Sequence, residues 1–229
     1  LYGMADEKLI PLDGAVPEYV PSVADMEDAT LLDLCNGTAG IGSSKATVQP
    51  YLMNTPGREW APLQLASFGL GEKRSEVGVY RESDAGYLML GMALERASGK
   101  SASELIAEYV TVPLGLEATE LPGDAPATPT PEPAMAGNYL PKIEGGYDCT
   151  APIDATEMSA SAGFTDSGVT TTIEELGRYV QAEARQALRP ENAKPARYGA
   201  PLPVSEKSPS WYQATGGAYL VGSMIGQQG

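Results

Sequence analysis

The sequence predicts an α+β fold that is mostly helical, with short strands near its C-terminal end. An acidic residue three positions after Thr or Ser predicts capped helices that start at Thr30, Ser101 and Thr172. Residues 217–222 and 223–226 predict two short strands near a turn. The 229 residues make one large domain or two small ones, enough for a sizeable core.

The first third of the chain predicts short helices between turns. Residues 1–13 are expected to be the end of a helix running into a turn, and residues 9–21 a proline-punctuated extended segment. Thr30 should open a short helix that leads into a glycine-containing turn at residues 36–41. A further helix is expected near residues 62–68, within a stretch that is otherwise rich in loops.

Residues 84–97 form the strongest predicted helix, and Gly99 should end it. Its apolar face is expected to consist of Tyr87, Leu88, Leu90, Gly91 and Leu94. The Ser101 pattern predicts a helix that ends near residue 110. The Thr172 pattern, with Glu175 reaching back to the cap, predicts a helix that ends near residue 188.

Two segments have the composition of surface loops. Residues 122–133 hold five prolines with alanine and threonine, and residues 190–209 are polar and proline-rich. Neither segment carries a chemical motif.

Charge and composition exclude several kinds of function. Thirty acidic against 15 basic side chains give a net charge of −15, so nucleic acid and anionic membranes are not expected partners. No histidine is present, which removes Ser-His-Asp triads, Cys-His dyads and most zinc sites. Any base for nucleophilic chemistry must be lysine, tyrosine or a carboxylate. No run is apolar enough to span a membrane.

Cys35 and Cys149 do not form a Cys-x-x-Cys pair, which argues against a metal knuckle or a thioredoxin-like centre. They are either two buried free thiols or one disulfide that closes a long loop, and a disulfide would imply an exported protein.

Residues 80–87, Tyr-Arg-Glu-Ser-Asp-Ala-Gly-Tyr, precede an apolar helix that ends in Gly99-Lys100. They resemble the second active-site motif of the penicillin-recognising serine hydrolases, which include class C β-lactamases, D-alanyl-D-alanine carboxypeptidases and related esterases. That motif is roughly aromatic-x-Tyr-Ser-Asn/Asp-x-Gly-Tyr, so Glu82 stands where the family has its catalytic tyrosine. Weaker similarities occur in the family's order at residues 9–21, 31–41, 112–119 and 162–176.

The resemblance implies acyl transfer by a serine in a Ser-x-x-Lys segment. No serine in this sequence has lysine three positions later, so the nucleophile is expected upstream of Leu1. The chain is therefore interpreted as a partial domain over residues 1–229. It would be mostly the helical subdomain of a β-lactamase/penicillin-binding-protein-like fold, with part of an antiparallel sheet.

The resemblance also assigns site residues. Glu82 and Asp84 take catalytic positions, with Asp84 as a partner of substrate or lysine, and Ser83 is expected to bind substrate. A solvated Glu82 at a helix N-terminus is the plainer alternative.

The family's third motif, Lys/His-Thr/Ser-Gly, has two candidate matches. Ala214-Thr215-Gly216 keeps Thr-Gly and loses the cation. Gln227-Gln228-Gly229 fits better, because a predicted strand and turn precede it. In that match Gln227 takes a catalytic position, and Gln228 and Gly229 bind substrate.

The function implied by the resemblance is a serine hydrolase that forms an acyl-enzyme on a peptide, ester or lactam carbonyl. Its partner would be a small molecule or a peptidoglycan peptide, with no metal and no cofactor. The alternative is a catalytically impaired module that binds or supports. The resemblance to exported enzymes favours a Cys35–Cys149 disulfide and a secreted, periplasmic or cell-wall location. The sequence does not indicate an oligomeric state.

Overall fold

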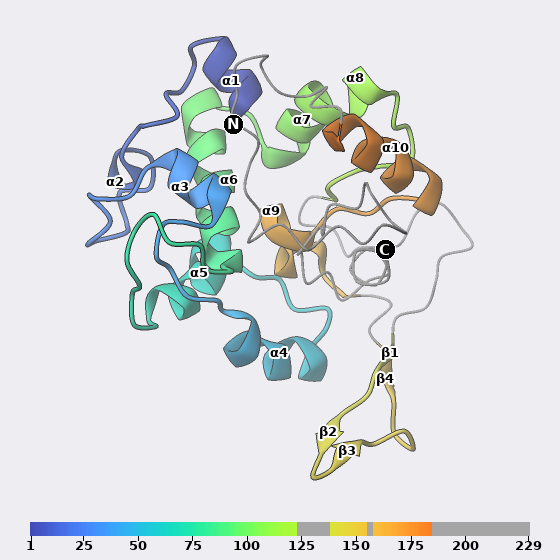
Figure 1. Ribbon diagram of the computed structural model, residues 1–229. Coiled ribbons are helices and arrows are strands. Elements are labelled where there is room, and N and C mark those ends of the chain that lie inside the picture. The colour runs from blue at the N-terminus through green and yellow to red at the C-terminus, as the bar shows by residue number, and fades with distance from the viewer. Residues whose placement is uncertain (123–137, 155–157, 185–229) are drawn as a thin grey trace, which may run out of the picture.

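The computed structural model describes residues 1–122, 138–154 and 158–184. The predicted α+β fold is confirmed, with helices dominating the described parts and strands only two residues long (Figure 1). The elements before the strands are α1 (Tyr2–Asp6), α2 (Val16–Tyr19), α3 (Leu31–Asn36), α4 (Lys45–Asn54), α5 (Pro62–Leu70), α6 (Asp84–Ser98), α7 (Ala102–Ile106), η1 (Ala107–Thr111) and α8 (Val112–Leu114). Later elements are β1 (Asn138–Tyr139), β2 (Lys142–Ile143), β3 (Gly146–Tyr147), β4 (Ile153–Asp154), η2 (Ala160–Ala162), α9 (Phe164–Ser167) and α10 (Ile173–Ala184).

Helix α6 is the centre of the core. It packs against α5, α9, α3 and α2 (Figure 1). Its Leu88, Met89 and Ala93 are buried. The predicted bounds agree with the structure to within one residue, and Gly99 ends the helix with a left-handed φ of 70°. The core therefore forms around the helix that carries the family motif at its N-terminus.

Close approach of α9 to α6 depends on Gly91. A Cβ atom on Gly91 would fall inside the side chain of Thr165. Thr165 Oγ1 also donates a hydrogen bond of 2.8 Å to the carbonyl oxygen of Tyr87. Helix α9 is thereby held against the middle of α6.

The capping predictions are correct for two helices and partly wrong for the third. Full capping boxes start α3 at Thr30 and α7 at Ser101. Thr172 Oγ1 accepts a hydrogen bond of 3.2 Å from the backbone N–H of Glu175, as expected. However, the Glu175 carboxylate does not reach back. It accepts hydrogen bonds from the backbone N–H of Ala118 and from Thr119 Oγ1, so it ties α10 to the segment after α8.

The helix predicted to end near residue 110 continues in a different form. After α7 the chain widens into the π-helix η1, in which the N–H of Val112 donates to the carbonyl of Ala107. Pro113 follows in α8, where it has no N–H to donate to an α-helical partner.

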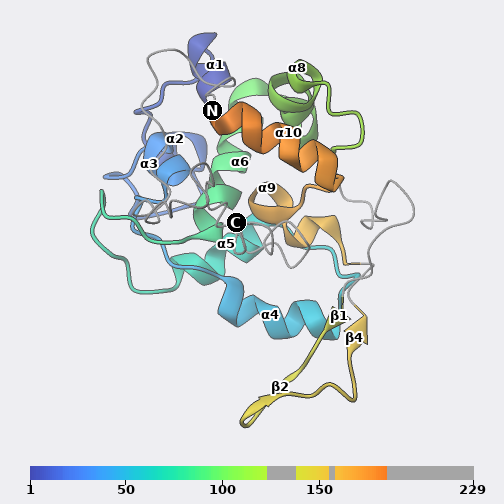
Figure 2. The same cartoon turned by 45° about the vertical axis from the view of Figure 1, so that its right-hand side comes forward.

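Two short antiparallel pairs form an arm that projects from the helices in both views (Figures 1 and 2). Strand β1 pairs with β4 and β2 pairs with β3, with Lys142 opposite Tyr147. The amino-acid pattern does not predict these strands, because each is too short for an alternating pattern. The strands predicted at 217–222 and 223–226, the loop at 190–209 and most of that at 122–133 lie outside the described residues.

The predicted Cys35–Cys149 disulfide is absent from the structure, and this prediction is corrected. Cys35 lies in α3 and packs against the core, whereas Cys149 is exposed on the projecting arm, and the two are not bridged. None of the described helices is both long enough and apolar enough to cross a membrane.

Candidate active site

Ser83 fixes the family motif at the start of α6. Its Oγ accepts a hydrogen bond of 3.1 Å from the N–H of Gly86 and donates one of 2.8 Å to the carbonyl of Gly42. This serine is therefore a helix cap and a tie to the segment before α4. Its hydroxyl is engaged by protein groups on both sides, and substrate binding by Ser83 stays a prediction.

Asp84 is buried at the first position of α6 and anchors the start of α4. Its Oδ1 accepts hydrogen bonds of 2.8 Å from both Ser43 Oγ and the N–H of Ser44, and its Oδ2 accepts one from Ser44 Oγ. These donors satisfy a carboxylate that is only 6% exposed. The structure thus places Asp84 as a local anchor, and its contact with substrate stays a prediction.

Asp84 and Ser83 together bring Lys45 to the motif. Lys45 is the first residue of α4, and its Nζ lies 3.0 Å from Glu82 Oε1 and 4.0 Å from Asp166 Oδ2. The side chains of Asp166, Lys45 and Glu82 are 7%, 21% and 55% exposed. We call these three residues the ion triad. It runs from the interior to the surface beside the N-terminus of α6.

The charges of the ion triad keep Lys45 protonated. Burial by itself would lower the pKa of Lys45, but the charges of Asp166, Glu82 and Asp84 and a hydrogen bond to Glu82 outweigh it. The pKa therefore lies above its usual value, and Lys45 is an ammonium ion at neutral pH. Burial also raises the pKa of Asp166, and Lys45 opposes that shift only in part. Lys45 can supply a fixed positive charge but is a poor base.

Sequence reasoning missed Lys45 and Asp166. Lys45 is separated from Glu82 by 37 positions and belongs to none of the family similarities noted above. Asp166 follows Phe164, a non-glycine residue whose φ is 36°. Nothing in the local sequence signals that Asp166 lies beside Lys45.

The ion triad offers one carboxylate for chemistry. Glu82 is exposed and charge-paired, so it can accept a proton or bind a donor group of a substrate. The described residues contain no group of three or more His, Cys, Asp or Glu that could hold a metal ion. Gln227, Gln228 and Gly229 lie outside the described residues, so their predicted roles stay predictions.

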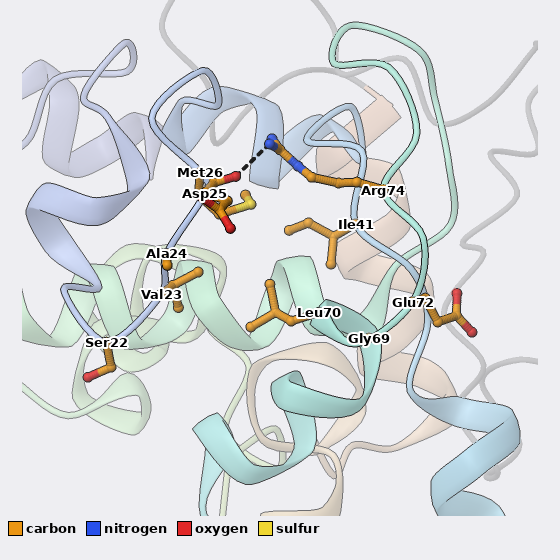
Figure 3. A pocket seen from close by; sticks show the side chains of 10 residues that line it. All are labelled: Ser22, Val23, Ala24, Asp25, Met26, Ile41, Gly69, Leu70, Glu72 and Arg74. Atoms are coloured by element: carbon orange, nitrogen blue, oxygen red, sulfur yellow. Dashed lines mark hydrogen bonds between the residues drawn. The ribbon is translucent and has the colours of Figure 1, made fainter.

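A separate cavity of about 400 Å³ lies between the loop before α3 and the segment after α5 (Figure 3). Val23, Met26, Ile41 and Leu70 give it an apolar lining. Arg74 at its rim binds the carbonyl of Asp25, the carboxylate of Asp28 and the carbonyl of Ala39. The lining contains no residue of the family motif or of the ion triad.

The fold resembles solved structures of amide-cleaving and penicillin-binding proteins. A D-stereospecific amidohydrolase from Streptomyces sp. has a TM-score of 0.70 at 20% identity, over 83% of this chain and 58% of that chain. A D-amino acid amidase from Ochrobactrum anthropi SV3 complexed with D-phenylalanine has 0.65 at 16%, over 82% and 53%. An octameric penicillin-binding protein homologue from Pyrococcus abyssi has 0.59 at 20%, over 81% and 42%. At these identities the likeness is one of fold.

The chain spans between 42% and 58% of the length of these three proteins. No curated protein matches the sequence. The sequence model of one family, described as Beta-lactamase, matches residues 1–227. The capped motif, the helical fold around it and this match agree, and the chain belongs to the Beta-lactamase family, with its serine hydrolase fold.

Proposed function

We propose that the protein is a serine hydrolase that forms an acyl-enzyme on a peptide, ester or lactam carbonyl, as D-alanyl-D-alanine carboxypeptidases and class C β-lactamases do. One observation carries the proposal. Glu82, at the position of the family's catalytic tyrosine, presents an exposed carboxylate that Lys45 holds at 3.0 Å beside the capped start of α6. The nucleophile is expected to be a serine of a Ser-x-x-Lys segment outside residues 1–229.

Each side chain has a distinct part in the proposed reaction. The serine oxygen bonds to the carbonyl carbon, and its proton passes to Glu82 and then to the departing amine or alcohol. Water next cleaves the acyl ester, which releases the acid and restores the serine. Asp84 keeps the start of α4 in place, and Lys45 balances the charge of Glu82. Gln227 takes the position of the third motif's cation.

The substrate we propose is an amide, either a small molecule or a peptidoglycan peptide. Support comes from the amidohydrolase, amidase and penicillin-binding protein homologue whose folds this chain resembles. The test uses the full-length protein with a fluorophosphonate and a labelled penicillin, followed by mass spectrometry of the adduct. A covalent adduct on one serine is expected. A folded protein that forms no adduct with either probe would refute the hydrolase.

The alternative is a binding or structural module that has the same fold but has lost catalytic activity. It is favoured by the loss of the tyrosine at Glu82 and by the protein hydrogen bonds that engage Ser83 and Asp84. Two substitutions separate the proposals. Glu82→Ala abolishes turnover if Glu82 is a working base, whereas Glu82→Tyr raises turnover if the site is intact but impaired.

We also propose that the protein is secreted or held in the periplasm or cell wall. This rests on the family resemblance alone, because the disulfide that would have favoured export is absent from the structure. Cell fractionation with an antibody tests it. Recovery of all the protein in the cytosolic fraction would refute export.

A further inference from the structure

We propose that Lys45 is a positioning residue of this hydrolase, which holds the Glu82 carboxylate where the family has its tyrosine and is itself anchored on buried Asp166. The inference deepens the proposed function and rests on it. It assigns roles to two residues that belong to none of the family's three motifs.

The first argument is that the start of α4 is pinned to the motif. The hydrogen bonds from Ser43 and Ser44 to Asp84 fix the two residues that precede Lys45. The hydrogen bond from Ser83 Oγ to the Gly42 carbonyl fixes the residue before them. The Lys45 backbone is therefore placed by buried polar contacts, and its ammonium has a defined position relative to Glu82.

The second argument is that the neighbouring cation is engaged elsewhere. Arg81 directly precedes Glu82 in the sequence, but its guanidinium binds the Glu72 carboxylate and the Lys73 carbonyl. Lys45 forms the ion pair with Glu82 instead, across 37 positions of sequence. A local ion pair would need no tertiary structure, whereas this one forms only when Ser43 and Ser44, just before α4, are hydrogen-bonded to Asp84 at the start of α6.

The third argument concerns the exchange of tyrosine for glutamate. A glutamate is shorter than a tyrosine and charged, and a flexible exposed side chain samples many rotamers. An adjacent cation restricts those rotamers and so holds the carboxylate in one position. Asp166 in turn holds the other side of the ammonium at 4.0 Å from within the protein. The ion triad thus fixes the position of the Glu82 carboxylate, as the position of a tyrosine hydroxyl would be fixed in the family.

An exposed ion pair with only a structural role is the competing explanation, and such pairs contribute little. The two differ in kinetics. In the full-length protein, Lys45→Met should lower kcat for a p-nitrophenyl ester by about 10- to 100-fold, with little change in KM. Misalignment of Glu82 should remove only part of the roughly 100- to 10,000-fold that a positioned general base contributes. Lys45→Arg keeps the charge and should retain kcat to within a few-fold. Lys73→Met, at an exposed lysine between α5 and α6, is the matched control.

Non-additivity gives the sharper result. If Lys45 acts through Glu82, the Lys45→Met/Glu82→Gln protein should be no slower than the worse single variant. Where Lys45→Met fails to fold, Lys45→Met/Asp166→Asn also removes the carboxylate that loses its cation and allows the same comparison. Equal kcat for wild type and Lys45→Met, or fully multiplicative losses, would overturn the inference while leaving the hydrolase intact.

Competitive labelling with acetic anhydride reports the geometry without any turnover. The reagent attacks neutral amines, so protonated Lys45 should react more slowly than exposed Lys73 in the wild type, and several-fold faster after Glu82→Gln. Equal rates for Lys45 in both proteins would overturn the ion triad itself. A wild type that shows slow Lys45 labelling but forms no covalent adduct would refute the proposed function, and the positioning role with it.

Discussion

Gly91→Ala should destabilise this protein, although alanine favours a helix more than glycine does. Gly91 lies in the interior of α6, where alanine would stabilise an isolated helix by about 1 kcal/mol. However, the new Cβ would overlap Thr165 in α9. Thr165 must then move, and its hydrogen bond of 2.8 Å to the Tyr87 carbonyl is strained or lost.

The magnitude follows from the opposing effects. Overpacking a close contact costs about 1–3 kcal/mol, and the lost hydrogen bond costs about 1 kcal/mol. Subtracting the helix gain of about 1 kcal/mol leaves a net loss of about 1–3 kcal/mol in the free energy of unfolding. Gly177→Ala in α10 is the matched control, because a Cβ there meets no atom within 4 Å. It should stabilise the protein by up to about 1 kcal/mol.

Urea unfolding of the full-length variants, followed by circular dichroism, measures both changes. Adding Thr165→Gly to Gly91→Ala removes the overlapping side chain, so the double variant should lose less stability than the sum of the singles. Equal stabilisation by Gly91→Ala and Gly177→Ala would refute the close packing of α9 on α6. Strict additivity in the Gly91–Thr165 pair would refute Thr165 as its cause.

Three further predictions follow from burial and charge. Met89→Ala removes a fully buried side chain of α6 and should lower the free energy of unfolding by about 2–5 kcal/mol, measured by urea titration. Hydrogen bonds from Thr119 and nearby backbone N–H groups lower the pKa of Glu175 below its usual 4.5, so the stability it contributes is present above pH 4.5 and lost as pH falls through the lowered pKa. Glu175→Gln should therefore flatten the acid end of a thermal-melt pH series, and an unchanged slope would contradict this assignment. Burial raises the pKa of Asp166 above 3.8. The stability that protonated Asp166 contributes is therefore lost as pH rises through the raised pKa. The free energy of unfolding of Asp166→Asn should increase relative to that of the wild type as pH rises from 3 to 7.

Local sequence rules succeeded where the partners lie within one turn of helix. The Thr30 and Ser101 boxes, and the bounds of α6 with its stop at Gly99, rest on contacts between residues three to five apart. The same rule failed for the Glu175 side chain. Two backbone N–H groups, of Glu117 and Ala118, and the Thr119 hydroxyl offer that carboxylate more donors than the local cap does.

The disulfide prediction failed for a related reason. The prediction rested on a resemblance to exported proteins, which carries no information on the positions of the two cysteines. Cys35 packs against the helical core, Cys149 is exposed on the projecting arm, and the two are not bonded. The exposed arm itself was also beyond pattern reasoning, since two-residue strands carry no period.

The sequence by itself determined the family, the mostly helical α+β class and the position of Glu82 and Asp84 at a capped helix start. Motifs and helix caps depend on residues that are close together in the sequence, so they can be recognised without the fold. Only the tertiary structure decided what those residues touch. In the structure Asp84 accepts hydrogen bonds from Ser43 and Ser44. Lys45, which is distant in the sequence, forms ion pairs with both Glu82 and Asp166. Charges far apart in the sequence become neighbours only when hydrogen bonds tie the start of α4 to the start of α6 and α9 packs against α6.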